Sequence, residues 1–82
     1  MKCLLVEDDQ ALARELSQAL RDGDWLVEHA ANGQDADFLV RTEAYDTLIL
    51  DVGLPDGDGT RWLAAWREDG IDLPVLILTA RE

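Results

Sequence analysis

The chain has 82 residues, enough for one small domain, and 48% of them are hydrophobic, so it can build a packed core. The formal net charge is −11, from 18 acidic and 7 basic residues. This charge argues against the segment binding nucleic acid or an anionic membrane by itself, and it is compatible with a cation or a basic protein as partner.

Cysteine content and hydropathy point to a cytoplasmic protein. Cys3 is the only cysteine, which excludes an intrachain disulfide and favours a buried thiol in a reducing compartment. The N-terminus leads directly into an apolar run, so we expect no signal peptide. No apolar stretch approaches the length needed to cross a membrane, and we expect no membrane partner.

The first elements alternate between strand and helix. The apolar run at residues 2–6 predicts a strand, and Asp9 is well placed to cap a helix over residues 10–22. Residues 25–30 predict a second strand, in which we expect His29 to be a surface residue. The expected apolar stripe of the helix consists of Leu12, Leu16, Ala19 and Leu20.

The rest of the chain continues the alternation. The expected elements are a helix from about residue 32 to 43, a strand at 47–50, a loop at 52–59, a helix at 60–68 and a strand at 74–78. In the loop, Asp56 and Asp58 are interpreted as turn formers. The expected inward residues are Ala36, Leu39 and Val40 in one helix and Trp62, Leu63 and Trp66 in the next.

This alternation predicts right-handed βαβ crossovers and a single parallel α/β sheet. The strand at 74–78 has no helix after it, although a parallel sheet needs both of its faces covered. We therefore expect a domain that is cut off, with an apolar strand exposed at its edge. Such a surface predicts self-association of the chain.

Acidic residues follow two of the predicted strands directly. Glu7 and Asp8 come after the first strand, and Asp51 comes after the third. Carboxyl ends of neighbouring parallel strands meet at one edge of the sheet, where open α/β sheets bind ligands. Carboxylates gathered there repel one another unless a cation lies among them, so the pattern is either a site for a hard cation or an energetically costly accident.

These segments resemble the receiver domain of two-component response regulators. The resemblance covers the whole chain in order, and it rests on the LLVEDD, LDVGLPDGDG and LPVLILTA segments at residues 4–9, 50–59 and 73–80. The Gly53-Leu54-Pro55 loop is similar to the branch that carries a winged-helix DNA-binding domain. The resemblance implies a flavodoxin-like, doubly wound sheet with strand order 2-1-3-4, truncated before the fourth helix and fifth strand and without its effector domain.

The resemblance also implies roles for individual residues. Asp51 matches the phosphoacceptor, and Thr79 matches the switch hydroxyl. Asp8 matches the direct Mg²⁺ ligand, Glu7 its acidic partner, and Gly53 the residue whose backbone carbonyl binds the ion. Mg²⁺ would screen the charge of an attacking aspartate and of the transition state.

The implied partner is a sensor histidine kinase, and DNA would be bound only through the missing effector domain. The implied domain is a phosphoacceptor and not an enzyme. One departure concerns the lysine that the family places at the end of its fifth strand. Lys2 is the only lysine here, and it begins the first strand, at the opposite edge of the sheet.

Two alternatives stay open at this point. The chain could be a non-switching interaction module that uses the receiver scaffold, because it lacks the fifth-strand lysine. It could also be a Mg²⁺-dependent phosphatase with an aspartyl intermediate. Such enzymes usually carry a second acid two residues after the nucleophile, a position that Gly53 occupies here.

Overall fold

The computed structural model describes residues 1–78, which form a four-stranded parallel sheet and a short hairpin. The strands of the sheet are β1 (Lys2–Val6), β2 (Leu26–Ala30), β3 (Thr47–Asp51) and β6 (Val75–Leu78). They lie in the order β2-β1-β3-β6, and each neighbouring pair is parallel. Because β6 is the fourth strand of this sheet along the chain, the predicted order 2-1-3-4 is confirmed.

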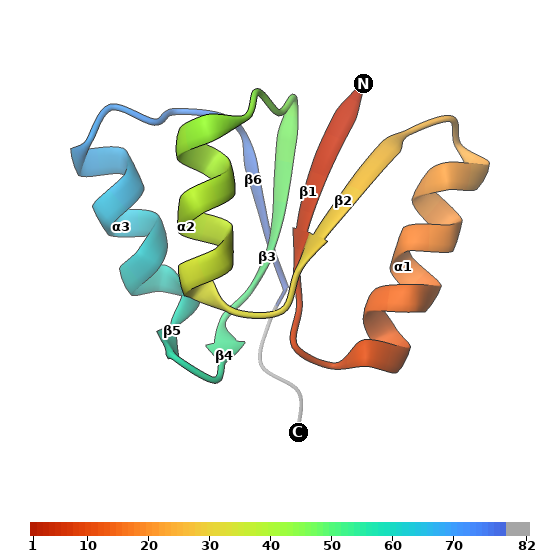
Figure 1. Cartoon of the computed structure of the whole chain (residues 1–82), viewed down its shortest axis with the longest axis horizontal. Coiled ribbons are helices and arrows are strands. Elements are labelled where there is room, and N and C mark those ends of the chain that lie inside the picture. The colour runs from red at the N-terminus through yellow and green to blue at the C-terminus, as the bar shows by residue number, and fades with distance from the viewer. Residues whose placement is uncertain (79–82) are drawn as a thin grey trace.

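Helices cover both faces of the sheet, so the fold is doubly wound and flavodoxin-like (Figure 1). Helix α1 (Gln10–Asp22) lies on one side, and α2 (Gly33–Thr42) and α3 (Gly59–Glu68) lie together on the other. Within the described part of the chain, no helix is both long and apolar enough to span a membrane.

The two faces of the sheet carry separate hydrophobic cores. The larger core, under α2 and α3, contains Leu4, Leu48 and Trp66, and the Trp66 side chain is only 1% exposed. The smaller core, under α1, contains Cys3 and Leu5. Burial raises the pKa of the Cys3 thiol, consistent with the core position expected from the sequence.

Helix α1 begins as predicted, and its expected apolar stripe is confirmed at Leu16 and Leu20, which pack against the smaller core, but not at Ala19. The side chain of Asp9 accepts a hydrogen bond from the Leu12 N–H at 3.0 Å, so the predicted cap is confirmed. The buried residues of the helix are Ala13 and Ser17, whereas Ala19 is exposed. At 3.6 residues per turn, Ala19 lies about 120° around the helix from Ala13, which turns it away from the sheet.

The loop predicted at residues 52–59 contains regular structure. Strands β4 (Gly53–Leu54) and β5 (Gly57–Asp58) form a small antiparallel hairpin below the carboxyl edge of the sheet (Figure 1). Helix α3 begins at Gly59, directly after this hairpin, because the Asp58 side chain caps it by accepting the Thr60 N–H. The hairpin thereby forms most of the connection between β3 and α3.

Strand β6 pairs with β3 and forms one edge of the sheet in the described residues. Its middle residues, Leu76 and Ile77, are 60% and 38% exposed. Val75 and Leu78 pack against the two hydrophobic cores instead. The exposed apolar edge expected from the sequence is therefore present in this part of the chain.

Candidate metal centre

Three carboxylates meet at the carboxyl edge of the sheet. Glu7 and Asp8 directly follow β1, and Asp51 is the last residue of β3. Strands β1 and β3 are parallel neighbours with Val6 paired to Leu50, so the next residue of each strand lies at the same level. Each of the three carboxylates offers an oxygen, and these oxygens lie within 4.8 Å of one another.

The cluster is well shielded from solvent. Glu7 is 0% exposed, Asp51 is 1% exposed, and Asp8 is half-buried. Negative charges held this close in a buried site repel one another strongly unless a cation compensates them. A donor set made only of carboxylate oxygens matches the preference of Mg²⁺ for hard ligands, so these residues fit that ion.

Hydrogen bonds fix the backbone and side chain of Glu7. Its N–H donates to the Ala30 carbonyl at 3.0 Å, and its carboxylate accepts the Asp9 N–H at 3.0 Å. The Nε2 of His29 lies 2.7 Å from the Glu7 carbonyl oxygen. His29 is exposed, as expected, yet it has a hydrogen-bond partner that the sequence does not reveal, because the contact is to backbone.

Two glycines lie close to Asp51. A Cβ at Gly53 would lie 3.8 Å from Asp51 Oδ2, so this residue borders the cluster. A Cβ at Gly59 would lie 2.5 Å from the Asp51 backbone oxygen, a distance that no side chain tolerates. The role of Gly53 as a carbonyl ligand stays a prediction. Gly59 is a supporting residue that the sequence predicted only as part of the loop at 52–59.

Asp56 and Asp58, interpreted above as turn formers, are helix caps. The carboxylate of Asp56 accepts the N–H groups of Gly33 and Gln34, at 2.7 and 2.8 Å, and so reaches across to α2. Burial alone would raise the pKa of Asp56, but the N–H groups of Gly33, Gln34 and Asp56 itself together outweigh it and lower the pKa. The hydroxyl and N–H of Thr60 lower the pKa of Asp58.

The predicted switch residue, Thr79, lies outside the described residues, and its role stays a prediction. The last residue of β6, Leu78, pairs with Asp51.

Lys2 lies at the opposite edge of the sheet, as its place in the sequence indicates. Its Nζ lies 3.2 Å from Glu43 Oε1 and 3.4 Å from Glu28 Oε2. Hydrogen bonds to Glu43 and Glu28 raise the pKa of Lys2. This lysine is therefore engaged in holding β1 to its neighbours and is remote from the acidic cluster.

The chain forms a doubly wound α/β domain. Three carboxylates lie at the carboxyl edge of its parallel sheet. Residues 3–82 match the family model of the response regulator receiver domain. The match covers nearly the whole sequence, so the chain belongs to the response regulator receiver domain family.

Relatives of known function are transcriptional regulators. The chain is 44% identical over 82 residues to the transcriptional regulatory protein PmrA of Pectobacterium parmentieri and 38% identical to PhoP of Escherichia coli K12. In both cases the match covers 100% of this chain and 37% of the relative. The chain therefore spans little more than a third of the length of these relatives.

Solved structures of receiver domains share the fold. The receiver domain of a Francisella response regulator superposes with a TM-score of 0.94 at 31% identity, over 99% of this chain and 67% of that one. The response regulator TrrA of Thermotoga maritima, in complex with Mg²⁺ and BeF, superposes with a TM-score of 0.91 at 26% identity, over 99% and 70%.

Proposed function

We propose that this chain is a phosphoacceptor in which Asp51 receives a phosphoryl group from a sensor histidine kinase, with Mg²⁺ bound at the acidic cluster. The single observation that carries the proposal is the convergence of Glu7, Asp8 and Asp51 within 4.8 Å at the carboxyl edge of the sheet. The solved Mg²⁺–BeF complex of TrrA, a protein of the same fold, supports it.

Each residue of the cluster has a distinct part in this proposal. Asp8 and Asp51 supply carboxylate oxygens to the ion, Glu7 supports them, and Gly53 contributes its backbone carbonyl. When bound, Mg²⁺ neutralises negative charge on the phosphoryl oxygens and lets an anionic nucleophile approach. Asp51 then forms a P–O bond through one carboxylate oxygen as the bond between phosphorus and the donor breaks.

The rigidity of β3 favours the reaction. Leu48 and Leu50 are fully buried beneath α2 and α3, and Ile49 is buried beneath α1, so the strand that carries Asp51 is packed on both faces of the sheet. A nucleophile held in place does not lose orientational freedom when the donor arrives, and this lowers the barrier. The backbone of Gly59 packs directly against the backbone of Asp51.

For the whole protein we propose transcriptional regulation in the cytoplasm. The relatives named above are transcriptional regulators, and this chain corresponds to 37% of their length. Phosphorylation would rearrange the segment at Thr79 and thereby control DNA binding by an effector domain elsewhere in the protein.

The intact mass of the chain after incubation with Mg²⁺ and acetyl phosphate tests the proposal. We expect the parent to gain one phosphoryl group and Asp51→Asn to gain none. Asp69→Asn is the matched control, because it removes the same charge at the C-terminal end of α3 and should gain the group like the parent. Equal labelling of the parent and Asp51→Asn would refute Asp51 as the acceptor.

A second candidate function is that of a non-switching interaction module, which the exposed edge of β6 favours. We propose that two copies of the chain associate through this strand, because Leu76 and Ile77 expose apolar surface next to free edge positions of the sheet. Light scattering should show a concentration-dependent dimer that Leu76→Lys abolishes. A monomer across a broad concentration range would refute the association.

A further inference from the structure

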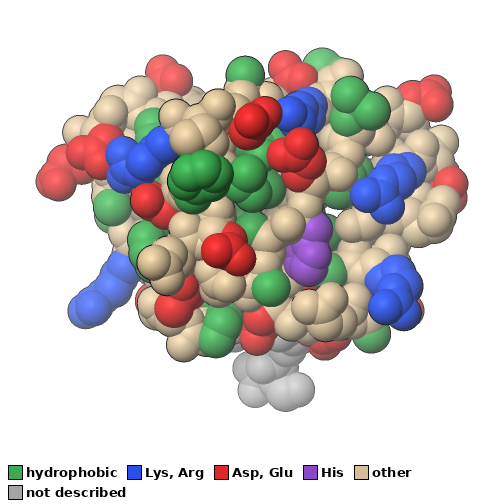
Figure 2. Space-filling model, viewed as in Figure 1, with side chains coloured by type: hydrophobic (Ala, Val, Ile, Leu, Met, Phe, Trp, Pro, Cys, Tyr) green, Lys and Arg blue, Asp and Glu red, His purple; other side chains and the backbone are tan. Residues whose placement is uncertain are grey.

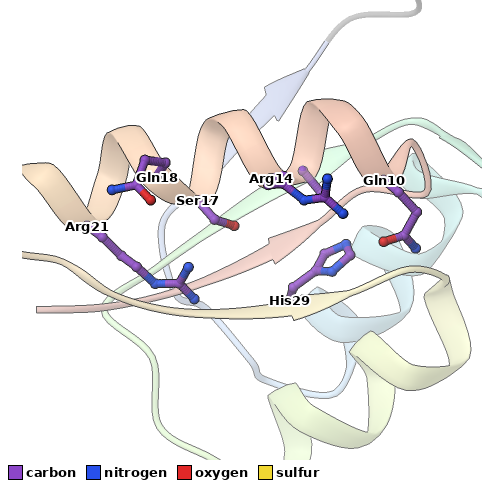
Figure 3. Close-up of a pocket in the computed structure, with 7 residues that line it drawn as sticks. Gln10, Arg14, Ser17, Gln18, Arg21 and His29 are labelled. Carbon is purple, nitrogen blue, oxygen red and sulfur yellow. The ribbon is translucent and has the colours of Figure 1, made fainter.

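A cavity of about 250 Å³ lies between α1 and β2, on the face of the sheet opposite α2 and α3. Basic and polar side chains line it. Figure 3 shows Arg21 reaching from α1 to β2 at one end, and the ring of His29 pointing from β2 toward Arg14 at the other. Gln10 also points into this space. In the space-filling view, basic side chains lie to the right of the histidine, over α1 (Figure 2).

The two arginines are the unusual feature of this cavity. In residues 1–78 the ion pairs are formed by Lys2 and Arg41, and neither Arg14 nor Arg21 takes part in one. No carboxylate lines the cavity in this part of the chain. A protein with a net charge of −11 therefore keeps two guanidinium groups around one concave site without neutralising them there.

Several of these side chains are already held in place. An Nη2 of Arg21 donates to the Val27 carbonyl at 3.3 Å, and the His29 ring is held by its hydrogen bond to the Glu7 carbonyl at 2.7 Å. At the rim, the side-chain amide of Gln18 donates a hydrogen bond to the carboxylate of Asp22. Side chains that are ordered before a ligand arrives lose less entropy when it binds.

We propose that this cavity binds a short polyphosphate group, with Arg14 at one end and Arg21 at the other. The arginines are seven residues apart, about 10 Å along the helix axis, so each lines a different part of the cavity. A guanidinium group donates two parallel hydrogen bonds to phosphate oxygens. The cavity is smaller than the ~300 Å³ lower bound typical of drug-sized ligand pockets, which favours a compact ligand of two linked phosphates over a larger one.

The test is an amide NMR titration of the chain with pyrophosphate, in EDTA and without Mg²⁺, so that the acidic cluster and its phosphorylation play no part. We expect shifts confined to α1 and β2. Arg14→Gln and Arg21→Gln should each weaken binding about tenfold or more, the effect of losing a charge-assisted hydrogen bond. Inorganic phosphate should bind more weakly than pyrophosphate, because it reaches one arginine at a time.

Arg67→Gln is the matched control. Arg67 also donates to a backbone carbonyl, that of Ile71 at 3.0 Å, but it belongs to α3 on the other face of the sheet. This variant should bind pyrophosphate within about twofold of the parent. Equal weakening by Arg67→Gln would mean diffuse attraction by net charge and would overturn the proposal. So would the absence of shifts up to about 10 mM pyrophosphate, which saturates a millimolar site.

Discussion

The carboxylate of Asp56 accepts a hydrogen bond from the backbone N–H of Gly33, at 2.7 Å, across 23 residues of sequence. A second bond from Gln34, at 2.8 Å, makes the contact bidentate. Asn32 satisfies the next two donors of α2, accepting from the Asp35 N–H through its side chain and from the Ala36 N–H through its carbonyl. All four N–H groups at the start of the helix are thus paired.

This contact predicts that Asp56→Ala destabilises the chain. Removing a helix cap typically costs about 1 kcal/mol, with a range of about 0.5–2 kcal/mol. Here the loss also detaches the β4–β5 hairpin from α2, so we expect a value toward the upper end. Urea unfolding followed by circular dichroism measures the change. Asp72→Asn, at an exposed position, is the control and should stay within about 0.5 kcal/mol of the parent.

The same contact predicts a pH dependence. The folded chain lowers the pKa of Asp56 below its ordinary value of 3.8, so the stabilising contribution is fully present above that value. It is lost as the pH falls through the lower pKa of the folded state. The difference in unfolding free energy between the parent and Asp56→Asn should therefore be constant near neutral pH and shrink below about pH 4. A difference that grows in acid would contradict this assignment.

Gly33 has no room for a side chain. A Cβ at this position would lie 2.0 Å from Trp62 Nε1 and 2.2 Å from Trp62 Cε2. Gly33→Ala must push the indole aside or tilt α2, and overpacking of this kind typically costs about 1–3 kcal/mol. Thermal unfolding should show the loss, and the added mutation Trp62→Leu should recover part of it.

Gly23 provides the control for this substitution. It lies at the end of α1 with φ −92°, and the nearest atom to an added Cβ would be the Leu20 carbonyl oxygen, at 3.5 Å. Gly23→Ala should therefore change stability by less than about 1 kcal/mol. If both alanine variants were equally stable, Trp62 would not be packed against α2 as described.

Contacts made by side chains along the chain's own strands and helices could be predicted from the sequence. The apolar runs predicted the strands, and the resemblance to receiver domains implied their order. The acidic residues after β1 and β3 identified the cluster, because parallel strands bring their carboxyl ends together. The Asp9 cap followed from its position directly before a helical pattern. These features depend on periodicity and on near neighbours in sequence.

Contacts between distant backbone groups could not be predicted. The loop of Asp56 and Asp58 has the composition of a turn, and nothing in one sequence indicates that Asp56 reaches α2. His29 offered no partner because the group it contacts is the Glu7 carbonyl. The exposure of Ala19 depends on the angle at which α1 packs, which its neighbours on the sheet decide.

Trp66 anchors α3 to α2 through a buried polar contact. Its Nε1 donates to Asp37 Oδ1 at 2.8 Å, and the Nε of Arg41 donates to the same oxygen at 2.9 Å. Trp66→Phe removes this hydrogen bond and leaves a void in the larger core, so we expect a loss of about 2–3 kcal/mol. Arg41 retains Asp37 as a partner in the variant, which limits the cost.

A double-mutant cycle with Asp37→Ala isolates the hydrogen bond from the packing. We expect a coupling free energy of about 1 kcal/mol between Trp66 and Asp37 in urea unfolding. Trp62→Phe is the matched control, because Trp62 lies 6.5 Å from Trp66 between ring centroids and makes no hydrogen bond to Asp37 in the described residues. Coupling of equal size with Trp62 would place the effect in packing alone.

Mg²⁺ should stabilise the parent chain through the acidic cluster. At about ten times its dissociation constant, a ligand that binds only the folded state adds about 1.4 kcal/mol to the free energy of unfolding. Asp8→Asn and Asp51→Asn each remove one carboxylate of the cluster and should lose most of this gain. EDTA should return the parent to its metal-free unfolding temperature.

Without Mg²⁺, we expect Asp51→Asn to be more stable than the parent. Asp51→Asn removes one of three carboxylates that lie within 4.8 Å of one another, so its metal-free form should unfold at a higher temperature than the parent. Asp72→Asn, far from the cluster in sequence and exposed, should respond to Mg²⁺ like the parent. Equal stabilisation of the parent and Asp51→Asn by Mg²⁺ would show that the ion binds elsewhere, and it would remove the basis for phosphorylation at Asp51.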